Sequence, residues 1–295
     1  MDYRGKFIVK PGQRLRLTEI DPSYKGHQET ADAAVAETEE YRAKLTRLQS
    51  LLYAEKRRSV LIVLQALDAG GKDGIIKHVF ATFNPQGARV VGFKKPTDAE
   101  LAHDFLWRIH PYALAKGEIV IFNQDVLVTR VHRLIEKAAW TARYDRIREF
   151  EEGLAESGTT VLKFFLHISR DEQLFRFAER LEDPAHNWKI SASDYDERAL
   201  WNEYITAFDD ALSHTSTPHA PWYVIPANRK WFRNLVVSQI VADTIDELGL
   251  AYPPPTVDLT EIRRKYHIAE QAAEKARGLS VAAPSNQARG RSRTR

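Results

Sequence analysis

The sequence has no cysteine and only one methionine among its 295 residues. The absence of cysteine excludes a disulfide framework, thiolate zinc sites and a cysteine nucleophile, and it suits a reducing cytoplasm. No apolar run approaches the roughly 18 residues that a membrane-spanning helix needs. Residues 1–6 do not lead into an apolar segment, as the start of a secretory signal would. These absences predict a cytoplasmic protein.

Several catalytic motifs are absent as well. The 10 histidines show no H-E-x-x-H and no other metal-ligand spacing, which argues against zinc. Without G-x-S-x-G there is no hydrolase nucleophile elbow, and without G-x-G-x-x-G a dinucleotide site has no support. The net charge of +3 is too small to indicate a class of partner.

Residues 59–80 carry the strongest functional signal. The apolar run 59–65 has the length of a buried strand, and residues 75–80 have helical spacing. Residues 66–74 between them read Ala-Leu-Asp-Ala-Gly-Gly-Lys-Asp-Gly. A strand, a glycine-containing loop and a helix that starts with lysine form a phosphate cradle, because backbone N–H groups and the helix dipole favour an anion there.

This loop matches the phosphate-loop pattern G-x-x-x-x-G-K-[ST] only in part. Ala66 stands where the first glycine belongs, and Asp73 stands where the metal-binding Ser or Thr belongs. The loop also has a carboxylate of its own, Asp68. The alternative is an ordinary strand-to-helix turn, in which Gly70 and Gly71 only let the helix pack close to the strand.

The rest of the chain alternates strand and helix signals. We expect strands at 59–65, 88–93, 117–123, 160–166 and 222–225, and helices at about 27–58, 97–110 with a capping box of Thr97 and Glu100, 126–157, 172–182, 193–212, 230–248 and 259–276. The alternation predicts an α/β fold with a five-stranded parallel sheet covered on both faces. We expect an N-terminal extension (1–57), a core (58–250), a C-terminal helix (251–278) and a disordered basic tail (279–295).

Many charged side chains follow the predicted strand ends, where parallel sheets bind ligands. They are Asp68, Gly71 and Lys72 after the first strand, Lys94 and Lys95 after the second, Asn123 and Asp125 after the third, Arg176, Arg180 and Lys189 after the fourth, and Arg108 in the helix before the third. Each basic residue by itself is most simply a solvated surface charge. Together they favour phosphoryl transfer, in which cations neutralise phosphate oxygens and carboxylates hold a metal.

The chain resembles the polyphosphate kinase 2 family over nearly all of residues 5–250. The resemblance rests on residues 64–74, 93–97, 103–110, 117–123, 125–132, 180–184 with Trp188-Lys189, and 220–227. It implies a three-layer P-loop kinase fold similar to thymidylate kinase, with a helical lid at about 172–200. It also implies a Mg²⁺-dependent exchange of phosphoryl groups between inorganic polyphosphate and a nucleoside mono- or diphosphate. Asn123 resembles the branch that acts on both AMP and ADP.

The resemblance assigns roles to the charged residues. Asp68, Lys72, Arg108 and Arg180 would be catalytic, and Lys77, Lys94 and Lys95 would line a polyphosphate track. Nucleotide and phosphate binding would fall to Ala69, Gly70, Gly71, Asp73, Gly74, Arg176 and Lys189, and Mg²⁺ to Asp68, Asn123 and Asp125. The family tends to form homodimers and homotetramers, and we expect no membrane and no specific nucleic acid as partners.

One departure from the family follows Asn123. The family usually continues Phe-Asn-Arg-Ser-His-Tyr, then Glu or Gln, then Asp-Val-Leu, whereas Gln124-Asp125-Val126 follows Asn123 directly here. Four residues are missing, including an arginine that the family uses at the phosphates. Either the loop is truly shorter, which would put transfer in question, or this sequence skips residues, which the close match of both flanks favours.

Three functions fit the sequence. The first is a polyphosphate:nucleotide phosphotransferase that acts on AMP, ADP or GDP. The second is a nucleoside monophosphate kinase that uses ATP, although Lys94 and Lys95 suit a polyphosphate track better than a base pocket. The third is a non-catalytic sensor of polyphosphate or nucleotide, favoured if the loop after Asn123 is truly short.

Overall fold

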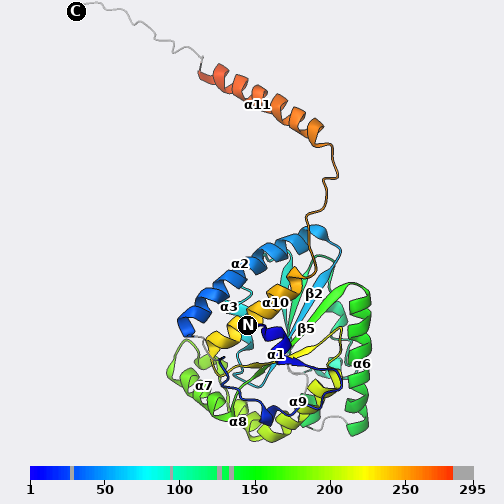
Figure 1. The fold of residues 1–295 in the computed structure, drawn as a ribbon, viewed down its shortest axis with the longest axis vertical. Helices are drawn as coiled ribbons and strands as arrows, with labels where there is room; N and C mark the ends of the chain where they lie inside the picture. Colours follow the sequence, from blue (N-terminus) through cyan, green and yellow to red (C-terminus); the bar gives the residue numbers. More distant parts are fainter. Residues whose placement is uncertain (27–29, 94–95, 125–127, 133–135, 282–295) are drawn as a thin grey trace, which may run out of the picture. The chain divides into compact units, whose positions relative to one another are not determined.

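The computed structural model describes residues 1–26, 30–93, 96–124, 128–132 and 136–281 (Figure 1). The chain divides into two compact units, Met1–Tyr252 and a second unit that begins at Pro253. The described part of the second unit contains one helix, α11 (Leu259–Val281), and its described side chains from 253 to 277 are exposed. Within these ranges, no helix has both the length and the apolarity to cross a membrane.

The first unit is built around a six-stranded sheet in the order β1-β6-β5-β2-β4-β3. Its strands are β1 (Ile8–Val9), β2 (Ser59–Ala66), β3 (Ala88–Phe93), β4 (Ile119–Gln124), β5 (Thr159–His167) and β6 (Trp222–Pro226). Strands β2 to β6 run parallel, which confirms the five predicted strands. The sixth, β1, pairs antiparallel with β6 at the sheet edge. Two residues are too few to show a strand pattern in a sequence.

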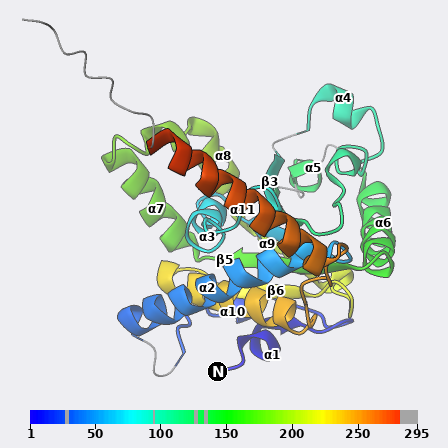
Figure 2. The same ribbon diagram turned by 90° about the horizontal axis from the view of Figure 1, so that it is seen from above.

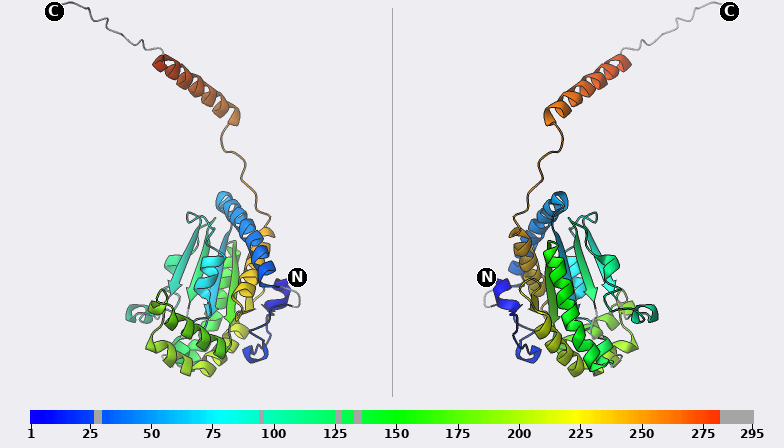
Figure 3. Two further views of the ribbon diagram at one scale, coloured as in Figure 1. Left: turned by 90° about the vertical axis from the view of Figure 1, so that its left-hand side faces the viewer. Right: turned by 90° about the vertical axis from the view of Figure 1, so that its right-hand side faces the viewer.

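Helices cover both faces of this sheet (Figure 3). The helices of the first unit are α1 (Tyr3–Phe7), α2 (Ala31–Glu55), α3 (Lys72–His78), α4 (Asp98–Leu101), α5 (Val128–Val131), α6 (Lys137–Glu156), α7 (Arg170–Glu182), α8 (Ala192–Ala199), α9 (Trp201–Thr215) and α10 (Lys230–Asp246). All eight residues of β2 are buried, as expected for a central parallel strand between two helical layers. The core therefore holds the loop that follows β2 in a fixed place.

The two ends of the first unit pack against each other. Helices α2 and α10 lie side by side (Figures 1 and 2), and Lys44 of α2 pairs with Asp243 at 3.1 Å and with Asp246 at 3.0 Å. The backbone N–H of Tyr3 donates to Oε1 of Gln239 at 3.2 Å. Residues 1–27, which the sequence presents as irregular, thus include α1 and β1 and complete the sheet edge.

The helix predicted for residues 97–110 is shorter than expected. It begins with the predicted capping box of Thr97 and Glu100, but α4 ends at Leu101. Asp104 accounts for the end, because its Oδ1 accepts the N–H of Leu106 at 2.9 Å. Such local hydrogen bonds compete with helical ones.

Two other predicted helices are interrupted. The helix predicted for 193–212 is two helices, because Ser191 caps α8 and the chain leaves the helical conformation at Leu200 before α9. The helix predicted for 126–157 is likewise divided, since α5 ends at Val131 and Glu136 is an extended cap before α6. Leu200 departs from helical dihedral angles and Glu136 is extended, so each break is a local change of the backbone that amphipathic spacing alone does not reveal.

Candidate active site

The loop between β2 and α3 lies at the carboxyl end of the sheet and makes a tight turn. Gly71 has a φ of 101° and comes directly before Lys72, the first residue of α3. Only glycine adopts this region without strain. Glycine is required at position 70 for another reason: a Cβ there would lie 2.4 Å from the Cβ of Ala66. Ala69 also has a positive φ, 59°, so the loop holds a conformation that its sequence would not adopt without support.

Helix α7 supplies that support. It follows β5, the neighbour of β2 in the sheet, and so begins at the same carboxyl end as the loop. Gln173 donates from Nε2 to the carbonyl of Asp68 at 3.0 Å, and Arg176 donates from Nη1 to the carbonyl of Ala69 at 2.8 Å. Two successive loop carbonyls are therefore turned toward α7. This fixes the orientation of the loop peptides and leaves N–H groups for a ligand.

Arg176 is a buried side chain whose hydrogen bonds support the loop. It is 5% exposed. Its Nη2 donates to the carbonyls of Ala227 at 2.6 Å and Asn228 at 3.2 Å, and its Nε bonds Glu172 at 2.8 Å. The predicted nucleotide contact of Arg176 stays a prediction, but the bonds in the structure assign the side chain to the loop and to the β6–α10 connection.

A cleft of about 680 Å³ opens in front of this loop. Most of the predicted site residues line it: Asp68, Ala69, Gly70, Gly71, Lys72, Asp73, Gly74, Asn123, Arg176, Arg180 and Lys189. Trp188 and Lys230 line it too. The structure thus brings the phosphate loop, the end of β4 and the segment 176–194 together, as the strand-end argument predicts.

A polar network crosses this cleft. Asp73 accepts from Nζ of Lys189 at 3.1 Å and from Nδ2 of Asn123 at 3.4 Å. Arg180 donates from Nη1 to the carbonyl of Lys189 at 3.0 Å. Lys72 donates from Nζ to the carbonyl of Ala66 at 3.2 Å, so its charge lies within the loop itself. The cations of the cleft are thus held by oxygen atoms of the chain itself.

Two predicted site residues of the described ranges, Lys77 and Arg108, do not line this cleft. Lys77 is exposed in the last turn of α3. Arg108 pairs with Glu100 at 3.3 Å and lies over the ring of Phe93 at 5.2 Å, beside a second cavity. Lys94, Lys95 and Asp125 lie outside the described residues. Gln124, where the sequence departs from the family, is still part of β4 and pairs in register with Gln65 and Phe93.

The carboxylates of the cleft suit a metal that arrives with phosphates. In the described ranges, no three His, Asp or Glu side chains gather to hold a metal ion by themselves. Asp68 and Asp73 both lie on the phosphate loop and line the cleft. Mg²⁺ is commonly bound by one or two carboxylates together with substrate phosphates. The donor set therefore fits Mg²⁺.

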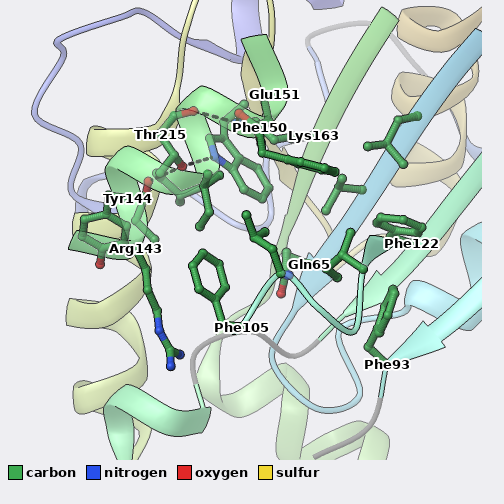
Figure 4. Close-up of a pocket in the computed structure, with 18 of the residues that line it drawn as sticks. Gln65, Phe93, Phe105, Phe122, Arg143, Tyr144, Phe150, Glu151, Lys163 and Thr215 are labelled. Atoms are coloured by element: carbon green, nitrogen blue, oxygen red, sulfur yellow. Dashed lines mark hydrogen bonds and ion pairs between the residues drawn. The ribbon is translucent and has the colours of Figure 1, made fainter. Parts of the chain in front are cut away.

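The second cavity is apolar and lies between the sheet and helices α6 and α9 (Figure 4). It has a volume of about 170 Å³, and its lining includes Phe93, Phe105, Phe122 and Phe150. At its edge a buried ion pair joins Nζ of Lys163 to Glu151 at 2.6 Å. Burial raises the pKa of Glu151 to about 7 and lowers the pKa of Lys163, and the attraction between the two charges opposes both shifts. This cavity offers aromatic surface rather than a phosphate site.

Two residues of the loop support were missed by sequence reasoning. Gln173 holds the carbonyl of Asp68, and Arg233 of α10 lies against the loop and is 2% exposed. The sequence has no signal for either, because a polar residue in an amphipathic helix is normally solvated. Arg233 lies just before the largely apolar stretch 235–242, and nothing in the spacing distinguishes it from a solvated arginine.

Comparisons with known proteins agree with this geometry. Residues 28–250 match the family described as Polyphosphate kinase 2 (PPK2). The chain is 49% identical over 258 residues to an AMP/ADP-polyphosphate phosphotransferase of Meiothermus ruber, covering 85% of this chain and 96% of that protein. It is 40% identical over 280 residues to an ADP-polyphosphate phosphotransferase of Rhodopseudomonas palustris, covering 88% and 94%. A crystal structure of polyphosphate kinase 2 from Arthrobacter aurescens TC1 superimposes with a TM-score of 0.86 at 38% identity, covering 90% and 96%.

Proposed function

Because the chain belongs to the polyphosphate kinase 2 family, we propose that it transfers phosphoryl groups between inorganic polyphosphate and AMP or ADP. The observation that carries the proposal is the cleft in front of the phosphate loop, where Lys72, Arg180 and Lys189 meet Asp68 and Asp73. Cations that surround a loop at a helix N-terminus suit phosphate, and carboxylates at the same place suit its metal.

The loop and its lysine would hold the transferring group. The backbone N–H groups of 69–72 and the charge of Lys72 stabilise negative charge on the phosphoryl oxygens. Asp68 and Asn123 would hold Mg²⁺, with Asp73 beside them on the loop, and the metal would supply positive charge that offsets the charge of the phosphates. Lys189 is released from Asp73 when phosphates enter and, with Arg180, neutralises the bound chain. Lys77, Lys94 and Lys95 are proposed to continue the polyphosphate track.

The proposed activity is tested by incubating the protein with ADP or AMP, polyphosphate and Mg²⁺. We expect ATP to form from ADP, and ADP to form from AMP. Polyphosphate-independent phosphorylation of AMP by ATP would indicate the nucleoside monophosphate kinase instead. Binding of polyphosphate without any transfer would indicate the sensor.

The carboxylate of Asp68 provides a sharper test. The Asp68→Asn variant should need a higher Mg²⁺ concentration for half-maximal activity and should lose about a hundredfold or more in kcat at saturating Mg²⁺, because an amide is a weaker ligand for a hard cation. Its affinity for tripolyphosphate without metal should be equal or higher, since one negative charge leaves the cleft. A Mg²⁺ titration of activity and a metal-free binding titration measure the two effects.

The control for Asp68→Asn is Asp246→Asn. Asp246 is the last residue of α10, and its exposed carboxylate pairs with Lys44 of α2 and does not line the cleft. Its Mg²⁺ requirement should equal that of the wild type. An Asp68→Asn variant with an unchanged Mg²⁺ requirement would exclude Asp68 as a metal ligand.

A further inference from the structure

Arg233 of α10 lies directly behind the phosphate loop. A Cβ built on Gly71 would be 1.9 Å from its Nη1, and a Cβ built on Gly74 would be 2.8 Å from its Nη2. Arg176 lines the cleft in front of the loop, whereas Arg233 is not among the residues that line it. The guanidinium therefore contacts the loop and the first turn of α3 without lining the cleft, and glycines at 71 and 74 make room for it.

No carboxylate compensates the charge of Arg233 within the described ranges. Its side-chain hydrogen bonds go to the neutral amide of Asn234, from Nε at 3.2 Å and from Nη2 at 2.9 Å. The charged group that acts on it is another cation, Arg176. Burial and this neighbour lower the pKa of Arg233 to about 9. The side chain is therefore still a cation at neutral pH.

An uncompensated cation at 2% exposure is costly for the free protein, because each buried ion loses several kcal/mol of hydration. The carboxylate beside Arg176 is Glu172, which bonds the Nε of that arginine, and no acidic group acts on Arg233 among the described residues. A structural role alone would be served at least as well by an apolar side chain of similar size. A countercharge on the other face of the loop would offset the cost, and an anion is what the cleft is built to receive.

We propose that Arg233 is a positioning residue that supplies positive charge through the loop to the phosphate groups held in the cleft. The inference rests on the proposed function, because it assumes that phosphates occupy the cleft. Arg233 touches loop residues and not the substrate, so it acts by its electric field and by fixing the loop. At an effective dielectric constant of about 20 and a separation of several ångströms, one such charge changes anion affinity by about tenfold to a hundredfold.

The test compares Arg233→Met with wild type. We expect the variant to have an equal or higher Tm without ligand, because it removes a buried charge. Its affinity for tripolyphosphate, measured by titration without metal or nucleotide, should fall by about tenfold to a hundredfold. In turnover, KM for polyphosphate should rise while kcat stays within about threefold, since the field acts on bound substrate and transition state alike.

Two further variants make the result specific. Arg233→Lys keeps the charge and should recover most of the affinity. Arg146→Met removes an arginine that is exposed on α6 and paired with Glu149 at 3.0 Å, and its affinity should stay within about twofold of wild type. If Arg233→Met does not fold, Arg233→Gln is judged by the same thresholds.

Wild-type affinity in a folded Arg233→Met or Arg233→Gln variant would overturn the inference. So would a variant that loses stability yet binds tripolyphosphate normally in its folded fraction, because that behaviour is purely structural. The two proposals can fail separately. If the wild type makes no ATP but binds tripolyphosphate, the proposed function fails and the titration still decides the role of Arg233.

Discussion

Replacing Lys72 with methionine should lower kcat/KM for phosphoryl transfer by about a hundredfold to a thousandfold, the usual loss when one donor to a transition-state charge is removed. Lys72 is the first residue of α3, and its Nζ lies against the carbonyl of Ala66 inside the loop. Methionine keeps the length and the flexibility of the side chain and removes its charge. Initial rates of ATP formation over a range of ADP and polyphosphate concentrations give the change.

Fold and stability should change little with the same substitution, because Lys72 is only half-buried and lies outside the hydrophobic core. Lys265→Met is the matched control, since Lys265 is exposed in α11 and pairs only with Glu261 at 2.7 Å among the described contacts. Its kinetics should equal those of wild type. Full activity in Lys72→Met would exclude the phosphate-loop assignment, whatever the family resemblance.

The second large effect concerns stability. Glu151→Leu should destabilise the fold by about 3–5 kcal/mol, because it leaves Lys163 as a buried, unpaired charge. Lys163 is 1% exposed, and besides Glu151 it donates to the carbonyl of Thr215 at 2.6 Å (Figure 4). Its Nζ also lies over the ring of Trp222. Urea denaturation monitored by circular dichroism measures the loss as a shift of the midpoint.

A double variant separates the lost pair from lost packing. Glu151→Leu combined with Lys163→Met replaces both ions by apolar groups and should recover about 2 kcal/mol or more of the loss. Glu261→Ala, which breaks the exposed pair with Lys265, should cost less than about 1 kcal/mol. A single Glu151→Leu variant as stable as Glu261→Ala would mean that the buried pair contributes nothing.

Much of the site was predictable because its signals are local in the sequence. The apolar run before Ala66 predicts a strand. The tight turn that follows, with Lys72 after it, predicts a phosphate site at the end of that strand. The placement of Asn123, Arg180 and Lys189 around one cleft follows from parallel topology, since carboxyl ends of parallel strands meet at one edge.

What the sequence did not reveal depends on contacts between distant segments. Gln173 and Arg176 hold loop carbonyls more than 100 positions away, at separations of 105 and 107. Arg233 reaches the loop from a helix that reads as apolar packing. Asp104 ends α4 by a side-chain bond to the next turn, where amphipathic spacing alone predicts a continued helix. These outcomes depend on packing geometry, which residue type and spacing do not encode.

The packing of α1 and α2 against α10 has a consequence for synthesis on the ribosome. Tyr3 bonds Gln239, which is translated 236 residues later. At roughly 5–20 residues per second, the first segment waits about 10–50 s for its partner. During that time the apolar face of α2 has no α10 to cover it, so the nascent chain is exposed to misassociation until its last core helix emerges. Folding of the first unit is therefore a late event of translation, and a chain arrested before residue 230 should remain a client of chaperones.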